Sequence, residues 1–144
     1  MEDMGAHSDH VKTAGATSPA TGATLLRCIG ASSMFRRMTD TACIVLCTFP
    51  DADVAQTAAG ALVGDRLAAC VNLLPGVTSI YRWEGEVHTD REALLLAKTS
   101  RRALAALEAR ILELHPYDVP EIVAVDITAG LPAYLQWVDT CVTA

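Results

Sequence analysis

The sequence predicts an α+β fold in which an antiparallel sheet carries two helices on one face. Runs rich in β-branched and apolar residues alternate with segments of helical spacing, in the order β-α-β-β-α-β. A last helical segment follows the fourth strand. The apolar fraction of 51% is enough to fill one core, and a length of 144 residues suits one domain rather than two.

The first strand and helix are predicted from a change in the spacing of apolar residues along the sequence. The run TACIVLCTF, residues 41–49, is dense in β-forming residues and ends at Pro50. The segment 51–67 then places its apolar residues at helical spacing. Asp51 or Asp53 can accept hydrogen bonds from the free N–H groups of the first turn, so either can be the N-cap.

A long hairpin is predicted next, between residues 68 and 99. Pro75-Gly76 predicts a bulge or bend in its first arm, because proline cannot donate to a strand ladder. The tripeptide EGE at 84–86 supplies the turn. ALLLAK at 93–98 is apolar on both faces, which is typical of a central strand.

The remaining elements complete the order. Residues 100–115 form the second helix, with Ser100 as N-cap and Pro116 as the stop, followed by a strand at 121–127 and a helix at 131–142. This order is the ferredoxin-like, split βαβ arrangement, which leaves one sheet face uncovered. That face and the exposed edges of a long hairpin predict self-association.

The first 38 residues differ in character from residues 39–144, which we predict to be the folded domain. Most of residues 1–38 are small, polar and aperiodic, so we expect a disordered tail. The alternative is a start codon assigned too early, with Met34 or Met38 as the true start. Acidic residues among the first ten argue against a transit peptide.

Charge and cysteine content exclude several classes of protein. The net charge of −6 argues against nucleic-acid backbones and anionic membranes as partners. The five cysteines are odd in number and form no C-x-x-C pair, which favours reduced thiols in the cytoplasm. No stretch approaches the ~18 uninterrupted apolar residues of a membrane span.

Five motifs stand in order over residues 45–137, namely VLCTFPD, LAACVNLLPGVTSIYRWEGE, LLLAKT, HPYDVPEI and YLQW. Together they strongly resemble the CutA divalent-cation tolerance family, over essentially the whole predicted domain. The resemblance implies a ferredoxin-like subunit in a tight homotrimer similar to that of PII signalling proteins. It also implies hairpins that extend sheets between subunits, and a role in tolerance of copper and other divalent metal ions.

The same resemblance implies a weakly bound copper or other divalent ion as the cofactor. In some family members the copper ligands are a cysteine at the position of Cys47 and two histidines before Pro-Tyr. Here that pair is Leu114-His115, so one ligand is missing. His115 is either a metal ligand or a cap for the end of its helix. Cys47 is either a ligand or a small core residue.

Other side chains are candidates for a cleft or an interface. Lys98 ends an apolar strand and needs a partner, for which we predict an inter-subunit salt bridge with Glu121 or Glu84. Glu121 and Tyr117, on either side of Pro120, are candidates to line a cleft.

The hairpin supplies further candidates. Tyr81 and Trp83 share a strand face and suit the anchoring of a partner sheet. Asn72 and Cys70 are assigned to the same cleft or interface.

Catalysis finds no support in the sequence. There is no G-x-S-x-G, no H-E-x-x-H and no glycine loop that could cradle a phosphate, so we predict no catalytic residues and no enzyme. The rival prediction is a PII-like regulatory module with a small ligand in an inter-subunit cleft. That cleft would lie near Lys98, His115, Tyr117 and Glu121.

Overall fold

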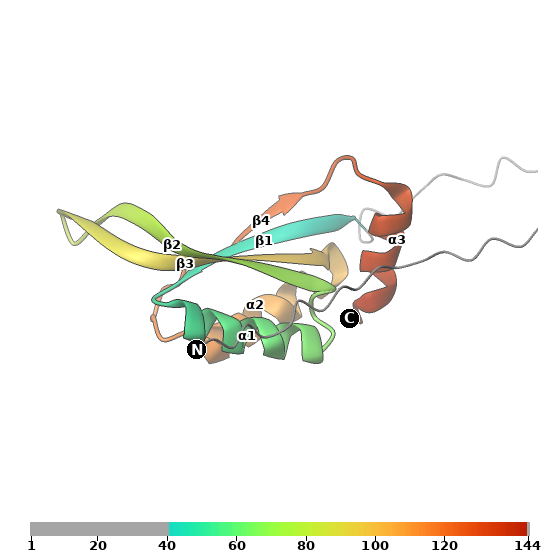
Figure 1. Ribbon diagram of the computed structural model, residues 1–144, viewed down its shortest axis with the longest axis horizontal. Helices are drawn as coiled ribbons and strands as arrows, with labels where there is room; N and C mark the ends of the chain where they lie inside the picture. Colours follow the sequence, from blue (N-terminus) through green and yellow to red (C-terminus); the bar gives the residue numbers. More distant parts are fainter. Residues whose placement is uncertain (1–40, 144) are drawn as a thin grey trace, which may run out of the picture. The chain divides into compact units, whose positions relative to one another are not determined.

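The computed structural model describes residues 41–143, so the predicted tail at 1–38 lies outside the described residues (Figure 1). These residues form a four-stranded antiparallel sheet and three helices, and the predicted order of elements is confirmed. The elements are β1 (Ala42–Phe49), α1 (Ala52–Gly64), β2 (Cys70–Trp83), β3 (Glu86–Ser100), α2 (Leu104–Leu114), β4 (Val123–Asp126) and α3 (Pro132–Cys141). None of the three helices is long and apolar enough to cross a membrane.

The core lies between one face of the sheet and two helices. The strands are ordered β2-β3-β1-β4, and α1 and α2 both lie on the same side of this sheet (Figure 1). Alternate β1 side chains point into the core, as the period of two requires. The fully buried members of this helix-facing side include Val45, Cys47, Phe49, Leu95 and Ala97, which pack on Leu62, Leu107 and Ile111.

The two predicted N-caps have different outcomes. Asp51 caps α1 as predicted, since its Oδ1 accepts from the Val54 N–H at 2.8 Å. Ser100 makes no cap hydrogen bond, and its Oγ is buried without a partner. Ser100 thus stands at the N-cap position of a 3₁₀ turn, Arg101–Ala103, that precedes α2, but it lacks the side-chain bond that a cap makes.

The hairpin β2–β3 follows its turn chemistry closely. The register shifts between Leu74 and Val77, where Gly76 has φ +73°, so the predicted bulge is confirmed. Glu84 and Gly85 form the turn with φ values of 49° and 88°, the pattern of a type I′ hairpin. The hairpin extends well beyond the part of the sheet that α1 and α2 cover (Figure 1).

The opposite side of the sheet, here called the open side, carries apolar side chains that no described element covers. Ile44 and Leu46 of β1 point to it, and their β4 partners Val125 and Val123 are 53% and 48% exposed. Leu74 of β2 is also exposed there. Apolar side chains grouped in this way mark a surface that contacts something else.

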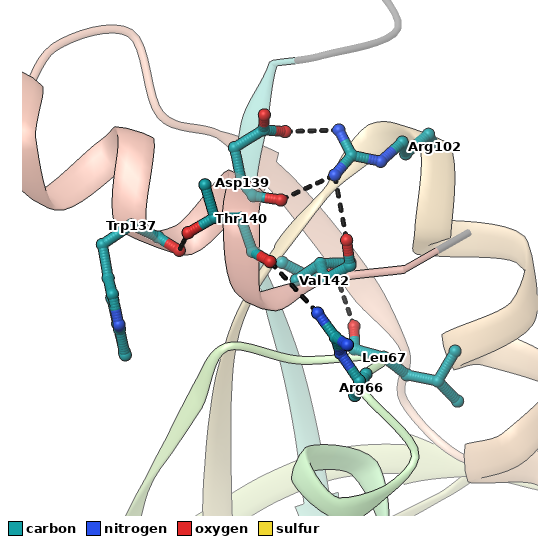
Figure 2. A network of polar contacts seen from close by, with 8 residues as sticks. Arg66, Leu67, Arg102, Trp137, Asp139, Thr140 and Val142 are labelled. Atoms are coloured by element: carbon teal, nitrogen blue, oxygen red, sulfur yellow. Dashed lines mark hydrogen bonds and ion pairs between the residues drawn. The ribbon is translucent and has the colours of Figure 1, made fainter.

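Two arginines hold the C-terminal end of α3 (Figure 2). Arg66 donates to Cys141 O and Thr140 O at 3.3 and 3.2 Å, and Arg102 donates to Asp139 O and Val142 O at 2.7 and 3.0 Å. The last carbonyl oxygens of a helix have no partner within it, and they carry the negative end of its dipole. Guanidinium groups at this position therefore stabilise α3 by hydrogen bonds and by charge.

Arg66 is placed for this role by an unusual backbone conformation. It follows α1 with φ 59°, in the left-handed region that glycine usually occupies at a helix end. The Leu67 and Arg66 N–H groups donate to Leu62 O and Val63 O at 3.0 and 3.1 Å, which is the Schellman pattern. The Arg66 carbonyl also accepts from Thr143 N at 3.0 Å, which joins the chain end to α1.

Replacing Arg102 should loosen the C-terminal helix without unfolding the sheet. Arg102 also forms an ion pair with the Asp139 carboxylate, so Arg102→Met removes a partly buried charge that serves several acceptors. We expect a loss of about 1–2 kcal/mol in the free energy of unfolding, from hydrogen bonds to a charged donor. Chemical denaturation measures this loss, and hydrogen exchange should accelerate first at residues 139–142.

The matched control for this change is Arg82→Met. Arg82 lies on the exposed hairpin and, among residues 41–143, donates only to Gly85 O in its own turn. Its replacement should change the free energy of unfolding by less than about 0.5 kcal/mol. Equal losses in the two variants would contradict the capping role assigned to Arg102.

Candidate functional site

His115 lies where the end of α2 meets the end of β1. Its Nε2–H donates to Thr48 O at 2.7 Å, and its Nδ1 accepts from the Tyr117 N–H at 3.1 Å. This pair of bonds corresponds to the neutral imidazole with the proton on Nε2. The ring also packs on Phe49, with ring centroids 4.4 Å apart. Both ring nitrogens are therefore engaged within the chain.

Cys47 lies on the helix-facing side of β1, next to this junction. Its thiol is fully buried, and its pKa is raised to about 12 by burial first, then by the negative charges of Glu121 and Glu92. The thiol is therefore protonated at neutral pH. Two carboxylates lie close enough to influence it, and a bound cation would have the opposite effect on its pKa.

A cleft of about 710 Å³ opens beside this junction, between the hairpin and the 116–121 loop. Three carboxylates line it, those of Glu92, Asp118 and Glu121, and no lysine or arginine from the described part of the chain does. The other lining residues include the aromatic side chains of Tyr81, Trp83 and Tyr117. The cleft is therefore negatively charged, with an aromatic wall.

Hydrogen bonds order the hairpin wall of this cleft. Tyr117 Oη donates to Glu92 Oε1 at 3.3 Å, and Tyr81 Oη donates to Asp90 Oδ2 at 2.5 Å. The bond to Asp90 raises the pKa of Tyr81 to about 12, and burial together with Glu92 raises the pKa of Tyr117. Both phenols stay neutral at physiological pH and donate to carboxylates, so neither adds negative charge to the cleft.

Several predicted site residues lie elsewhere. Lys98, which is 8% exposed, donates to Asn72 Oδ1 and to Leu96 O, and it forms no ion pair within residues 41–143. Lys98 and Asn72 line a second hollow on the open side, and Cys70 contacts Tyr134 at the same end of the sheet. The structure thus brings Tyr81, Trp83, Tyr117 and Glu121 together at the cleft, beside His115, and places the Lys98 group apart.

Sequence reasoning missed Glu92, which is the buried carboxylate of the cleft at 8% exposure. A usable signal was present in the strand period of two. Glu92 precedes Leu94 by two residues, so it points to the same side of β3 as Leu94, which is the open side. Thr48 was also missed. It contributes through its backbone carbonyl, for which no side-chain pattern gives a signal.

The donor set decides which cations suit the site. Within residues 41–143 no three His, Cys, Asp or Glu side chains form a ready-made metal cluster. Copper and zinc prefer imidazole and thiolate, but the His115 lone pair is in use and the Cys47 thiol holds its proton. The carboxylates of Glu92 and Glu121 keep oxygens that can accept a cation directly or through water. The arrangement thus suits weak binding of a divalent ion.

The sequence of this chain matches one family profile and is similar to known proteins of that family. The sequence profile described as CutA1 divalent ion tolerance protein matches residues 43–141. The divalent-cation tolerance protein CutA of Thermus thermophilus is 57% identical over 94 residues, which cover 65% of this chain and 91% of that protein. The chloroplastic protein CutA 1 of Oryza sativa subsp. japonica is 39% identical over 133 residues, or 83% of this chain and 75% of that protein.

Solved structures give the same result for the fold. The divalent cation tolerance protein (Cut A1) from Thermus thermophilus superposes with a TM-score of 0.70 at 53% identity. The match covers 71% of this chain and 99% of that chain. The match therefore extends over nearly the whole of that structure.

Proposed function

Because the chain belongs to the CutA1 divalent ion tolerance family, we propose that it acts in tolerance of divalent metal ions by binding copper or a similar ion weakly. The observation that carries this proposal is the cleft beside Thr48, which three carboxylates line without any lysine or arginine of residues 41–143. Such a cleft attracts cations and binds them through oxygens, with water completing the coordination. The proposed role is not enzymatic, in keeping with the relatives' names.

The proposed ligand set combines the sequence prediction with the geometry of the cleft. Glu92 and Glu121 would supply oxygens from the cleft. Cys47 is buried on the helix-facing side of β1, and neither it nor His115 lines the cleft, so both would join only after a local rearrangement that also displaces the thiol proton and one hydrogen bond of the imidazole. These displacements oppose binding, and the second histidine is replaced by Leu114. Both features support low affinity.

The proposal includes a homotrimer of ferredoxin-like subunits, similar to PII proteins, in the cytoplasm. Its support is the open side, where Leu74, Val123 and Val125 are exposed together. Ile80 and Trp83 on the projecting hairpin are exposed as well. A second copy that covers this surface would bury the apolar side chains and pair the hairpin edges. The cytoplasmic location rests on the cysteine pattern of the sequence, which is odd in number and has no C-x-x-C pair.

A metal titration tests the proposal. Chelator-treated protein is titrated by calorimetry with Cu(II), Cu(I) and Zn(II), as wild type and as Cys47→Ala, His115→Ala and Glu92→Gln. We expect weak binding in the wild type and a weaker signal in each variant. The matched control is Cys141→Ala at the C-terminal end of α3, which is no part of the cleft or of the junction beside it and should bind like the wild type. Wild-type affinity in all three site variants would refute the site.

The pH dependence of binding shows whether the Cys47 thiol joins the ligand set. Since its pKa is about 12, a metal that binds the thiolate must release one proton at pH 7. The apparent affinity should then rise by about tenfold for each pH unit from pH 7 to pH 9. Cys47→Ala should lose this slope. A wild-type affinity that stays flat over this range would exclude the thiolate from the site.

The alternative function, a PII-like regulatory module that binds a small ligand, also has a specific observation in its favour. The cleft volume of about 710 Å³ lies within the range of roughly 300–1,000 Å³ that is typical of small-molecule sites. Its aromatic wall and its carboxylates would suit an organic cation. Native mass spectrometry of freshly purified protein distinguishes the two, because a co-purified organic molecule at the cleft would favour the rival.

A further inference from the structure

Lys98 and Glu92 are buried charged side chains on the same strand. Both lie on β3, and both are 8% exposed. They are six residues apart, which is an even number, so both point to the open side of the sheet. The same spacing separates them by about 20 Å along the strand, so they cannot pair with each other in one chain. Each therefore needs a partner of opposite charge from elsewhere.

No carboxylate of residues 41–143 lines the hollow around Lys98. The hollow has a volume of about 310 Å³ and mainly apolar walls, with Asn72 and Tyr134 as its other polar residues. Lys98 Nζ donates to Asn72 Oδ1 and, at 3.4 Å, to Leu96 O, which are neutral acceptors. An ammonium group has three N–H donors, so one remains. Since a second copy covers the open side in the proposed assembly, we place the counter-ion of Lys98 on that copy.

The metal cleft has the opposite composition. Glu92, Asp118 and Glu121 line it, and no lysine or arginine of the described residues does. Glu92 already accepts from Tyr117 Oη at 3.3 Å, whereas Glu121 is exposed and makes no described hydrogen bond. Arginines of the same chain already hold four other carboxylates, those of Asp65, Glu113, Asp126 and Asp139. Glu121 is therefore a cleft carboxylate with both oxygens open to a partner.

The cleft and the hollow complement each other in charge and in the aromatic side chains at their borders. Tyr81 and Trp83 line the cleft, and Tyr134 lines the hollow and packs on Trp137, with ring centroids 5.4 Å apart. An interface that joins two different surfaces of one chain is heterologous, and such contacts form a ring when the rotation closes. Each chain has one cleft and one Lys98, so a closed ring supplies one ammonium group to every cleft.

We infer that Lys98 of one copy pairs with Glu121 in the cleft of the next copy and competes there with the metal ion, an inference that rests on the proposed function. An ammonium group in the cleft reduces its negative charge and makes charge-assisted hydrogen bonds to oxygens that a divalent ion would use. The ion must displace Lys98 before it can bind these oxygens. Lys98 therefore keeps the metal affinity low and makes it depend on assembly.

The ion pair is tested first in metal-free protein. The full chain has two lysines, Lys12 and Lys98, so lysine-selective ¹³C labelling gives two NMR signals, and Lys98→Met identifies the one from Lys98. We expect this signal to shift in Glu121→Gln and to stay unchanged in Glu84→Gln, which removes the carboxylate of the hairpin turn. A signal that is unchanged in Glu121→Gln, or one that shifts in Glu84→Gln instead, overturns the pairing.

The competition is tested by titrating the trimer with Zn(II) in a calorimeter. Lys98→Met keeps the apolar stem without the charge, and we expect it to bind Zn(II) at least tenfold more tightly than the wild type. Lys98→Arg keeps the charge and should bind like the wild type. In labelled wild-type protein, Zn(II) should shift the Lys98 signal saturably, and this readout needs no variant to fold.

Failure of the competition can be distinguished from failure of the proposed metal function. Equal Zn(II) affinity in the wild type and in Lys98→Met, or a Lys98 signal that does not respond to bound Zn(II), overturns the competition and leaves the metal function standing. If neither protein binds Zn(II), the metal function itself is refuted. The metal-free comparison of Glu121→Gln with Glu84→Gln then still decides whether the ion pair exists.

Discussion

Val125→Glu is expected to convert the proposed homotrimer into monomers. Val125 is 53% exposed on the open side, next to Ile44. A charge at this position costs the isolated chain little, because the side chain keeps its access to water. In an assembly that buries the open side, the same carboxylate would be desolvated without a partner, which costs several kcal/mol per interface. Light scattering at matched concentrations measures the change in mass.

The matched control for the assembly is Leu112→Glu. Leu112 is 50% exposed and lies on α2, which covers the helix-facing side of the sheet. It has nearly the same exposure and receives the same new charge, so it separates an effect on assembly from a general effect of charge. We expect this variant to keep the wild-type mass. A trimer that persists in Val125→Glu would show that β4 lies outside the interface.

His115→Ala is expected to lower the free energy of unfolding by about 2–4 kcal/mol in metal-free protein. The change removes the partner of Thr48 O and of the Tyr117 N–H, and each unpaired buried group costs about 1–3 kcal/mol. It also removes the ring that packs on Phe49. Chemical denaturation in the presence of a chelator measures the loss at a fixed protein concentration, since assembly shifts apparent stability.

The control for this change is His88→Ala. His88 stacks on Tyr81 along the exposed hairpin, with ring centroids 5.6 Å apart, and has no described hydrogen bond. Its loss should change the free energy of unfolding by less than about 0.5 kcal/mol. If His115→Ala left the stability of metal-free protein unchanged, the structural role assigned to the imidazole would be wrong. In that case, a loss of metal binding in His115→Ala could be attributed to the missing imidazole alone, because the variant would be as stable as the wild type.

The sequence predicts the order of elements well, because each element has a local cause. Asp51 caps α1, and Pro75-Gly76 bends β2, through interactions within a few residues of chain. The fourth strand is shorter than the predicted 121–127, since it pairs with β1 only from Leu46 back to Cys43. Two residues further along β1, Thr48 O accepts from His115 rather than from β4. That bond joins positions 67 residues apart, and no local pattern predicts it.

The candidate site is less predictable than the fold, because its residues come from segments that lie far apart in the sequence. Motif order identifies Tyr117 and Glu121, but it cannot show that Glu92 on a different strand completes the same cleft. It also groups Lys98 with these residues in a cleft between subunits; within one chain, Lys98 lines a separate hollow. Distances between side chains from different strands depend on register and twist, which are set by the assembled sheet.

Native mass spectrometry of chelator-treated protein, recorded before and after exchange into Cu(II), tests the proposed trimer and its metal site together. It reports the number of chains and the number of bound ions in the same spectrum. We expect three chains in each particle and added mass corresponding to up to one copper ion per chain, reduced in Glu92→Gln. A particle of one chain, or a trimer whose mass is unchanged by Cu(II), would contradict this expectation.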